Sequence, residues 1–380
     1  MRLEILRCMT QTNTTLPSVP NQERKHQMEI NLKSEMSLKE AEEFILSVGN
    51  EVSTHLVGQP GVGKTAMYER IVEKTGFRGI YIDTPNTELG DIGIPMPNHE
   101  NKTTALYPNE NWGFHHGDPC VIFIDEFTKP SSPAVQNMLH PLLSERRLGG
   151  FKLHEDSIVI TAGNNTTDGV GDMLKDHSIN RLTICPIANP TAEEWLEWAA
   201  LNGVAPEVMA WVKAYPHCMA SYKDPAQADN PYNFNPKNPK RSYFSPRSGY
   251  RSSNIIKKRS LITRNALVTA LCGTIGDAAA RDMTAYVEVA DTLPMWEDVI
   301  TNPQTAIVPT SPAALCIMAY GAVQRIDRGN VGKWFEYLKR TPKELQSVFC
   351  LTAGKHPEKK QIMMTSGSFV NWMRENQYLF

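Results

Sequence analysis

Five short apolar stretches, separated by polar segments, dominate the pattern between residues 53 and 188. They are rich in valine, isoleucine and threonine, and they are mostly continuous rather than alternating with polar positions. Continuous runs of this kind are typical of strands that are buried on both faces of a parallel sheet. The predicted strands cover residues 53–58, 79–84, 120–125, 157–162 and 182–188.

Helical patterns lie between several of these strands. One helix is predicted to end at Gly76, a residue suited to closing a helix. Another has Pro133 in its first turn, where the missing N–H costs little. This alternation of strands and helices predicts an α/β fold with three layers, in which helices cover a parallel five-strand sheet.

The chain divides into four predicted segments. Residues 1–35 lack hydrophobic periodicity and are expected to be a disordered tail, or the product of an upstream start codon. Capping-box spacing at Ser37 and Glu40 marks the start of the ordered chain, and the same spacing at Thr191 and Glu194 opens a part without further strand patterns. After the tail come an α/β domain of residues 36–190, a helical lid of residues 191–290 and a helical C-terminal extension of residues 291–380, which begins with an expected linker over residues 291–312.

The composition of the chain argues against several classes of protein. A length of 380 residues suits two or three domains, and a net charge of −2 gives no whole-chain signal for binding nucleic acid or an anionic membrane. The seven cysteines lack C-x-x-C spacing and the histidines lack an H-E-x-x-H pattern, so neither a disulfide framework nor a zinc site is expected. No apolar run approaches the roughly 20 residues of a membrane span, and no secretory signal is recognised, so a cytoplasmic location is expected.

Residues 58–65, GQPGVGKT, fit the pattern of a phosphate-binding loop between a predicted strand and a predicted helix. Gly61 and Gly63 let the backbone turn its N–H groups toward phosphates, and the helix N-terminus adds partial positive charge. Lys64 is expected to reach the β- and γ-phosphates of ATP, and the Thr65 hydroxyl to ligate Mg²⁺. The predicted nucleotide-binding residues here are Gly58, Pro60, Gly61, Val62, Gly63, Lys64, Thr65 and Ala66.

Two further strand ends carry candidate catalytic residues. The run VIFIDEF brings Asp125 and Glu126 to the carboxyl edge of the sheet, where open α/β sheets bind ligands. Asp125 is expected to hold Mg²⁺, and Glu126 to act as the general base for an attacking water. The run TAGNN ends in amides that suit positioning of that water; Asn164 is favoured, and Asn165 is the alternative.

The motifs GQPGVGKT, VIFIDEF, LLSERRLGG, ITAGNN, INRL and SPRS occur in this order. Over residues 37–250 the chain resembles MoxR-like AAA+ ATPases, a branch with an insertion near the second helix. LLSERRLGG and TPNTELGDIG are more specific to this branch than the phosphate loop is. The later residues 275–300 resemble the C-terminal part of MoxR-like proteins often seen in phages and bacteria.

This resemblance implies a helical lid, a hexameric ring of identical subunits and an arginine that completes the site of a neighbouring subunit. Arg181 occupies that position, in Asn-Arg-Leu where the family usually has Asp-Arg-Phe; Arg146 and Arg147 are alternatives. A guanidinium supplied in trans would neutralise charge on the γ-phosphoryl group. Arg247, in SPRS, resembles the lid arginine that contacts the nucleotide.

Two segments of the sequence allow more than one functional interpretation. Residues 237–264 carry many lysines and arginines but no acid, which fits either a nucleic-acid surface or, preferentially, a lid face that meets an acidic neighbour. Residues 95–118 form an insertion whose Tyr107, Trp112 and Phe114 could grip a client, although packing is the more common role of such residues.

The favoured function is ATP hydrolysis by a ring ATPase that remodels a partner protein, with a von Willebrand A-domain protein as the partner that the resemblance implies. A nucleic-acid motor or loader is the main alternative. A phosphotransferase is disfavoured because Glu126, Asn164 and Arg181 suit water attack and activation in trans. A scaffold that scarcely hydrolyses ATP is disfavoured by Glu126, and a GTPase by the absence of N-K-x-D.

Overall fold

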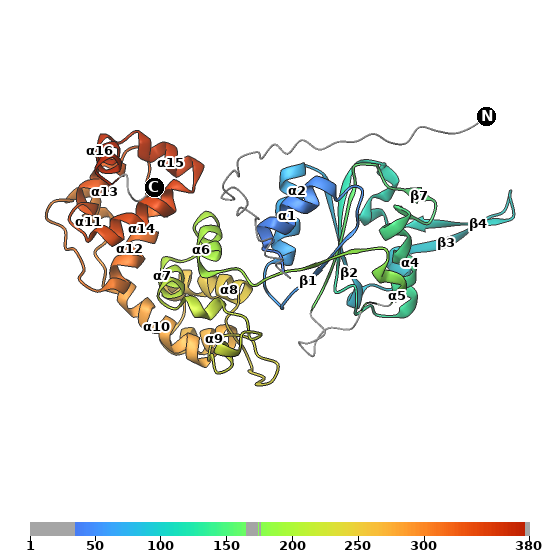
Figure 1. Ribbon diagram of the computed structural model, residues 1–380, viewed down its shortest axis with the longest axis horizontal. Coiled ribbons are helices and arrows are strands. Elements are labelled where there is room, and N and C mark those ends of the chain that lie inside the picture. Colours follow the sequence, from blue (N-terminus) through green and yellow to red (C-terminus); the bar gives the residue numbers. More distant parts are fainter. Residues whose placement is uncertain (1–34, 165–173, 175, 377–380) are drawn as a thin grey trace, which may run out of the picture. The chain divides into compact units, whose positions relative to one another are not determined.

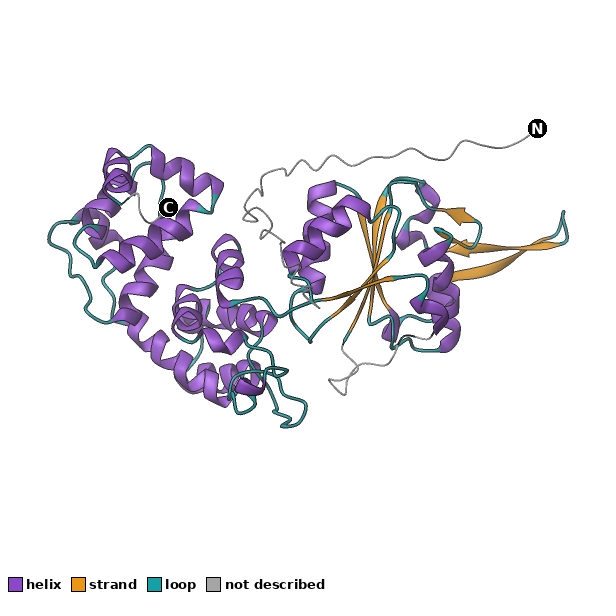
Figure 2. Cartoon of the chain, in the orientation of Figure 1, coloured by secondary structure: helices purple, strands orange, loops and turns teal. Residues whose placement is uncertain are grey.

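The computed structural model describes residues 35–164, 174 and 176–376. Within these ranges, all strands lie before residue 187, and the later elements are helices joined by loops (Figure 2). The tail predicted over residues 1–35 falls outside the described residues except for Glu35. No helix in the described ranges has the length and apolar character needed to cross a bilayer.

The central element is a five-stranded sheet in the order β2-β5-β8-β1-β9, in which every neighbouring pair is parallel. All five predicted strands are confirmed within a few residues. The second and third strands in this order, β5 and β8, are buried along almost their whole length, which explains their continuous apolar sequences. The strands are β1 (Thr54–Val57), β2 (Arg78–Asp83), β5 (Cys120–Asp125), β8 (Ile158–Gly163) and β9 (Thr183–Pro186).

Helices cover both faces of this sheet, which confirms the three-layer prediction (Figure 1). On one face, Ile45 and Met67 pack with Phe123 in one buried cluster. On the other face, Leu139 packs with Ile122 in a second cluster. The first face carries α1 (Leu38–Val48) and α2 (Lys64–Thr75), and the second carries α3 (Leu89–Ile92), α4 (Pro133–Ser144) and α5 (Asp176–Ile179).

Local signals define the helix ends as predicted. Ser37 and Glu40 form a reciprocal capping box, in which each backbone N–H donates to the other residue's side chain. Gly76 closes α2 with φ of +67°, a left-handed conformation that glycine adopts without strain. Pro133 is the first residue of α4, after the N-cap Ser132.

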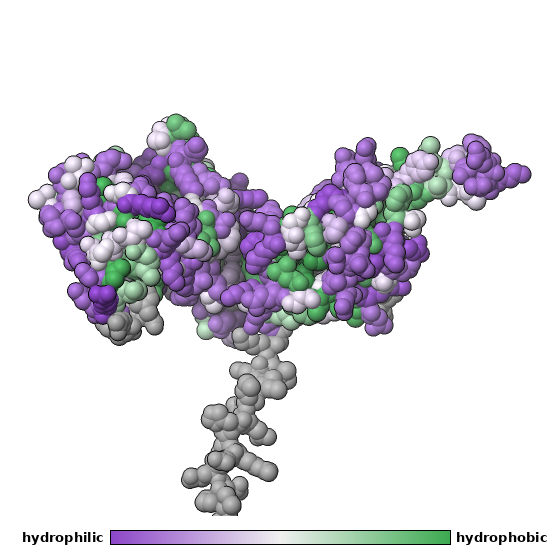
Figure 3. Space-filling view, turned by 90° about the horizontal axis from the view of Figure 1, so that it is seen from above, coloured by the Kyte–Doolittle hydropathy of each residue, from purple (hydrophilic) through white to green (hydrophobic). Residues whose placement is uncertain are grey.

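The insertion between β2 and β5 contains an antiparallel hairpin, which extends from the sheet (Figure 1). Figure 3 shows a hydrophilic tip and a more apolar stem, on which Ile94 and Tyr107 are exposed. Phe114, by contrast, is buried and meets Trp112 edge to face, so these two aromatic residues pack rather than face solvent. The hairpin consists of β3 (Gly93–Asn98) and β4 (Thr103–Pro108); the short pair β6 (Arg147–Leu148) and β7 (Phe151–Lys152) follows α4.

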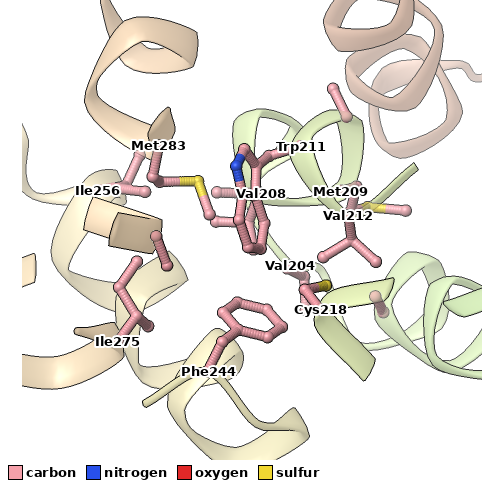
Figure 4. Packing of buried hydrophobic residues seen from close by; sticks show 14 of the residues in the cluster. Val204, Val208, Met209, Trp211, Val212, Cys218, Phe244, Ile256, Ile275 and Met283 are labelled. Carbon is pink, nitrogen blue, oxygen red and sulfur yellow. The ribbon is translucent and has the colours of Figure 1, made fainter. Parts of the chain in front are cut away.

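The helices of residues 191–290, which were predicted to form a lid, enclose a core of their own. Trp211 and Phe244 lie at its centre, with ring centroids 4.8 Å apart (Figure 4). The predicted capping box of Thr191 and Glu194 is present at the start of the first lid helix. The helices are α6 (Ala192–Leu201), α7 (Pro206–Ala214), α8 (Pro246–Lys257), α9 (Arg264–Ile275) and α10 (Asp277–Asp291).

A further helical cluster forms the C-terminal extension. The linker predicted over residues 291–312 is wrong in part, because it contains a helix whose Val299 is fully buried and whose Trp296 packs on Trp334. The last six helices are α11 (Trp296–Thr301), α12 (Pro312–Arg325), α13 (Val331–Leu338), α14 (Lys343–Gly354), α15 (Pro357–Met364) and α16 (Gly367–Glu375). Helix α12 contributes Tyr320 to the lid core and Leu315 to the extension core, so the two helical parts share an element.

Candidate nucleotide site

The predicted phosphate loop connects the end of β1 to the start of α2. Gly61 has φ of +80° and Gly63 has φ of +119°, values that L side chains rarely adopt. The first helical residue is Lys64, so the unpaired N–H groups of the α2 N-terminus lie directly after the loop. The local geometry therefore suits an anion, as the glycine spacing predicts.

The ammonium of Lys64 folds back over this loop. Its Nζ donates to the carbonyl oxygen of Gly58 at 2.8 Å and to that of Gln59 at 3.4 Å. It also lies 3.4 Å from Oδ1 of Asn164, just beyond the end of β8. The lysine thus joins the loop to the carboxyl edge of the sheet.

Asp125 and Glu126 lie at the end of β5, on the other side of β8 from the loop. Glu126 has φ of +49°, which is uncommon for a residue with a side chain. The Thr84 hydroxyl reaches both backbone carbonyls of the pair, Asp125 O at 2.9 Å and Glu126 O at 2.7 Å. Thr84, which the sequence analysis missed, therefore holds the acidic pair in this conformation.

Asn164 bridges the loop and the general-base candidate. Its Nδ2 donates to Oε1 of Glu126 at 2.8 Å while its Oδ1 accepts from Lys64. The structure therefore brings Lys64, Asn164 and Glu126 together, as the strand order requires. The alternative amide, Asn165, lies outside the described residues.

The side chains fit a nucleotide with its metal and a water. Glu126 Oε2 is buried and has no hydrogen-bond partner within the described part of the chain, so it can accept from a bound water. Asp125 and the Thr65 hydroxyl offer the oxygen ligands that Mg²⁺ prefers. The described ranges hold no group of three or more His, Cys, Asp or Glu side chains that could bind a metal ion. Mg²⁺ at nucleotide sites usually keeps several waters and binds substrate phosphates beside one or two carboxylates.

Tyr81 also belongs to this site, although nothing in its apolar run singled it out. Its hydroxyl donates to Oδ2 of Asp125 at 2.7 Å. Burial and this hydrogen bond raise the pKa of Tyr81, and the nearby positive charge of Arg247 offsets part of the rise. Tyr81 therefore remains a neutral hydrogen-bond donor, and Arg247 lies close enough to affect its pKa.

Lid residues touch the phosphate loop at two further points. The backbone N–H of Arg247 donates to the carbonyl oxygen of Gly61 at 3.3 Å, while its side chain is exposed. The Gln59 side chain donates to Ser221 Oγ at 2.6 Å and accepts from Asn189 Nδ2 at 3.1 Å. Arg247 and Ser221 therefore contact the phosphate loop through a backbone N–H and a hydroxyl group. The contact of Arg247 with a nucleotide stays a prediction.

The space between loop and lid is small. A cavity of about 20 Å³ lies there, and ligand pockets usually measure about 300–1,000 Å³. A nucleotide base bound at this face would therefore require the lid to move. The cavity is lined by Gln59, Pro60, Val62, Asn189, Phe244 and Pro246, among others.

The three candidate trans arginines differ in their surroundings. Arg146 is half-buried, and its guanidinium donates to the carbonyl oxygens of Ser157 at 3.2 Å and Gly49 at 3.1 Å, which indicates a structural role. Arg147 is exposed and pairs with Glu145. Arg181 is also exposed, after α5, with Nη1 3.5 Å from Nδ1 of His140.

One buried histidine lies beneath the site. His55 of β1 has Nδ1 2.7 Å from Thr161 Oγ1. Burial, and secondly the charge of Lys64, lower the pKa of His55 to about 4. It is therefore neutral at pH 7 and adds no positive charge beneath the loop.

The fold and these contacts define an AAA domain, a class that implies ATP binding and ATPase activity. Residues 53–175 match the family described as the AAA domain of the dynein-related subfamily.

Comparisons with individual proteins cover different shares of the chain. The chain is 31% identical over 121 residues to a Caenorhabditis elegans protein named ATP-dependent zinc metalloprotease YME1 homolog, a match that covers 30% of this chain and only 15% of that protein. The Thermotoga maritima RuvB Holliday junction branch migration motor matches with 16% identity and a TM-score of 0.36, covering 80% of this chain and 86% of that one. A candidate ATPase from Cytophaga hutchinsonii matches with 14% identity and a TM-score of 0.31, covering 86% and 87%.

Proposed function

We propose that this protein is a MoxR-like ring ATPase that hydrolyses ATP with Mg²⁺ and uses the energy to remodel or assemble a partner protein. The observation that carries the proposal is the hydrogen-bonded series from Lys64 through Asn164 to Glu126. It links the phosphate loop to a buried carboxylate oxygen, Glu126 Oε2, that lacks a partner in the described part of the chain.

Each residue has a distinct role in this proposal. Lys64 and the N–H groups of the loop bind the phosphates, and Thr65 and Asp125 hold Mg²⁺, which neutralises phosphate charge when bound. Glu126 takes the proton of the attacking water through its unpaired oxygen. Asn164 fixes the orientation of Glu126, and so ties water activation to the position of Lys64.

The ring and its partner rest on the resemblance to MoxR-like proteins. We propose that identical subunits form a ring, a hexamer as the resemblance implies, and that Arg181 of each subunit completes the site of its neighbour. The partner is a client protein or a von Willebrand A-domain protein, and the compartment is the cytoplasm. The exposed position of Arg181 is compatible with a role outside its own subunit.

Exposed basic residues along α8 and directly after it support the second candidate, a nucleic-acid motor. Arg251, Lys257 and Lys258 are exposed there, but Arg259 pairs with Asp291, which reduces the free positive charge. ATPase rates measured with and without DNA or RNA, across a salt series, separate the candidates. Strong stimulation that salt abolishes would favour the motor.

The proposed chemistry is tested by replacing Glu126 with glutamine. Glu126→Gln keeps the hydrogen-bonding shape but cannot accept the proton, so turnover should fall by about 10²- to 10⁴-fold. ATP affinity should stay within about twofold of wild type, since Glu126 does not bind phosphate. Steady-state phosphate release and ATP binding measure the two effects. Turnover at the wild-type rate would remove Glu126 from the mechanism.

A further inference from the structure

Tyr81 occupies an unusual place on the outermost strand of the sheet. It is 45% exposed on β2, where it pairs in register with the fully buried Phe123 of β5. The two rings are nearly parallel, at 18° and 5.9 Å between centroids. Phe123 stacks in turn on Tyr68 of α2 at 5.1 Å. This stack fixes the ring of Tyr81 and therefore the reach of its hydroxyl.

The hydroxyl ends on the carboxylate that the proposed function assigns to the metal. Oδ2 of Asp125 accepts from Tyr81 at 2.7 Å, and Oδ1 accepts from the backbone N–H of Glu126 at 3.0 Å. One hydrogen bond on each oxygen determines the orientation of the carboxylate plane. Each oxygen keeps a further lone pair that can bind a cation.

We propose that Tyr81 is a positioning residue for the metal, which orients Asp125 toward the Mg²⁺ of the bound nucleotide. The inference rests on the proposed function, because it needs Asp125 to be a metal ligand. Groups that hydrogen-bond to metal ligands set the direction of the ligand atoms, and their loss typically weakens metal affinity by about 10- to 100-fold. Tyr81 itself touches neither phosphate nor water in this role.

A purely structural role for this hydrogen bond predicts a different result. A hydrogen bond between two partly exposed groups adds only a little to stability. Its loss would then lower the melting temperature slightly and leave metal binding unchanged. Metal affinity, measured without turnover, therefore separates the two roles.

The test compares Tyr81→Phe with wild type in a Mn²⁺ titration of the ADP complex, followed by electron paramagnetic resonance. Tyr81→Phe keeps the aromatic stack and removes only the hydroxyl. Mn²⁺ affinity should fall by about 10- to 100-fold. Binding of fluorescent ADP in EDTA should match wild type, since it does not involve Asp125. Tyr68→Phe removes a hydroxyl from the same stack without touching Asp125, and should leave both measurements unchanged.

Two outcomes overturn the inference, and they are distinguishable. If Tyr81→Phe binds Mn²⁺ as tightly as wild type while both bind ADP, Tyr81 has no positioning role and the proposed function stands. If the wild type binds neither ADP nor Mn²⁺ with ADP, the proposed function and the inference fall together.

Discussion

Glu126 has a backbone conformation that is uncommon for a residue with a side chain. Its left-handed backbone conformation costs about 1–3 kcal/mol for a residue other than glycine. The Thr84 hydroxyl, which contacts the carbonyls of Asp125 and Glu126, offsets part of this cost. In this conformation the backbone leaves the path of the strand, and the Glu126 side chain lies against Asn164.

His55 gives a pH dependence with a defined sign. Its folded pKa of about 4 lies below the ordinary value of 6.5. Between these two pH values His55 is protonated in the unfolded chain and neutral in the folded chain. The free energy of unfolding should therefore fall as pH drops from about 6.5 to about 4, by roughly 3 kcal/mol from this residue.

Urea unfolding across this pH range measures the effect. His55→Asn removes the titrating group and retains a nitrogen for the contact with Thr161, so its stability should vary less with pH than that of wild type. The carboxylates that also titrate in this range are common to both proteins and cancel in the comparison. Parallel pH profiles for the two proteins would contradict a neutral, buried His55.

Candidate site residues can be predicted from the sequence where a short motif contains them. Lys64 and Thr65 follow a spaced pair of glycines, and Asp125 and Glu126 follow an apolar run, so short windows suffice to predict them. Tyr81 could not be predicted in the same way, because its contact with Asp125 depends on the register between β2 and β5. A tyrosine within a strand pattern has no signal of its own.

At the scale of elements, the strands and helices that could be predicted from the sequence differ in burial from those that could not. The inner strands β5 and β8 of the central sheet are buried, so their apolar runs are continuous and visible in the sequence. The hairpin of β3 and β4 is exposed along most of both strands, so no alternation reveals it. Helix α11 is only six residues long and lies among prolines, which made its segment resemble a linker.

At Gly61 the phosphate loop lies against the start of helix α8. A Cβ atom added at Gly61 would lie 2.9 Å from Ser245 Oγ, in addition to the strain of φ +80°. Gly61→Ala should therefore distort the turn that directs the loop N–H groups toward phosphates, and weaken ADP binding by at least about tenfold, or roughly 1.4 kcal/mol. Fluorescence titration with labelled ADP measures this change.

Gly76→Ala is the matched control. Gly76 also has a left-handed backbone, with φ of +67°, but a Cβ atom there would meet nothing within 4 Å. Both variants should lower the melting temperature through backbone strain, and only Gly61→Ala should lose ADP affinity. Equal ADP affinity in the two variants would show that the loop conformation at Gly61 does not matter for binding.

At the scale of the whole molecule, the proposed ring makes each site depend on a neighbouring subunit. Arg181→Ala should lower turnover by about 10³-fold or more, as loss of an arginine supplied in trans does. Arg147→Ala, which removes an exposed ion pair, should stay near the wild-type rate. Phosphate release measures both variants.

Mixed subunits test whether Arg181 acts in trans. Subunits with Glu126→Gln keep Arg181 but lack the base, and subunits with Arg181→Ala keep the base. A mixture should recover activity that neither variant shows alone, because each intact site can receive an arginine from its neighbour. No recovery in a mixture that forms mixed rings would place Arg181 outside the neighbouring site.

We propose that Lys64 and its loop bind the phosphates of a nucleotide. Calorimetric titration of Mg²⁺–ADP into wild type and Lys64→Ala measures this binding. Charge-assisted hydrogen bonds contribute about 1.5–3 kcal/mol, so affinity should fall by up to about a hundredfold. Lys74→Ala, on the same helix but paired with Glu42, should bind like wild type. Unchanged affinity in Lys64→Ala would contradict the account.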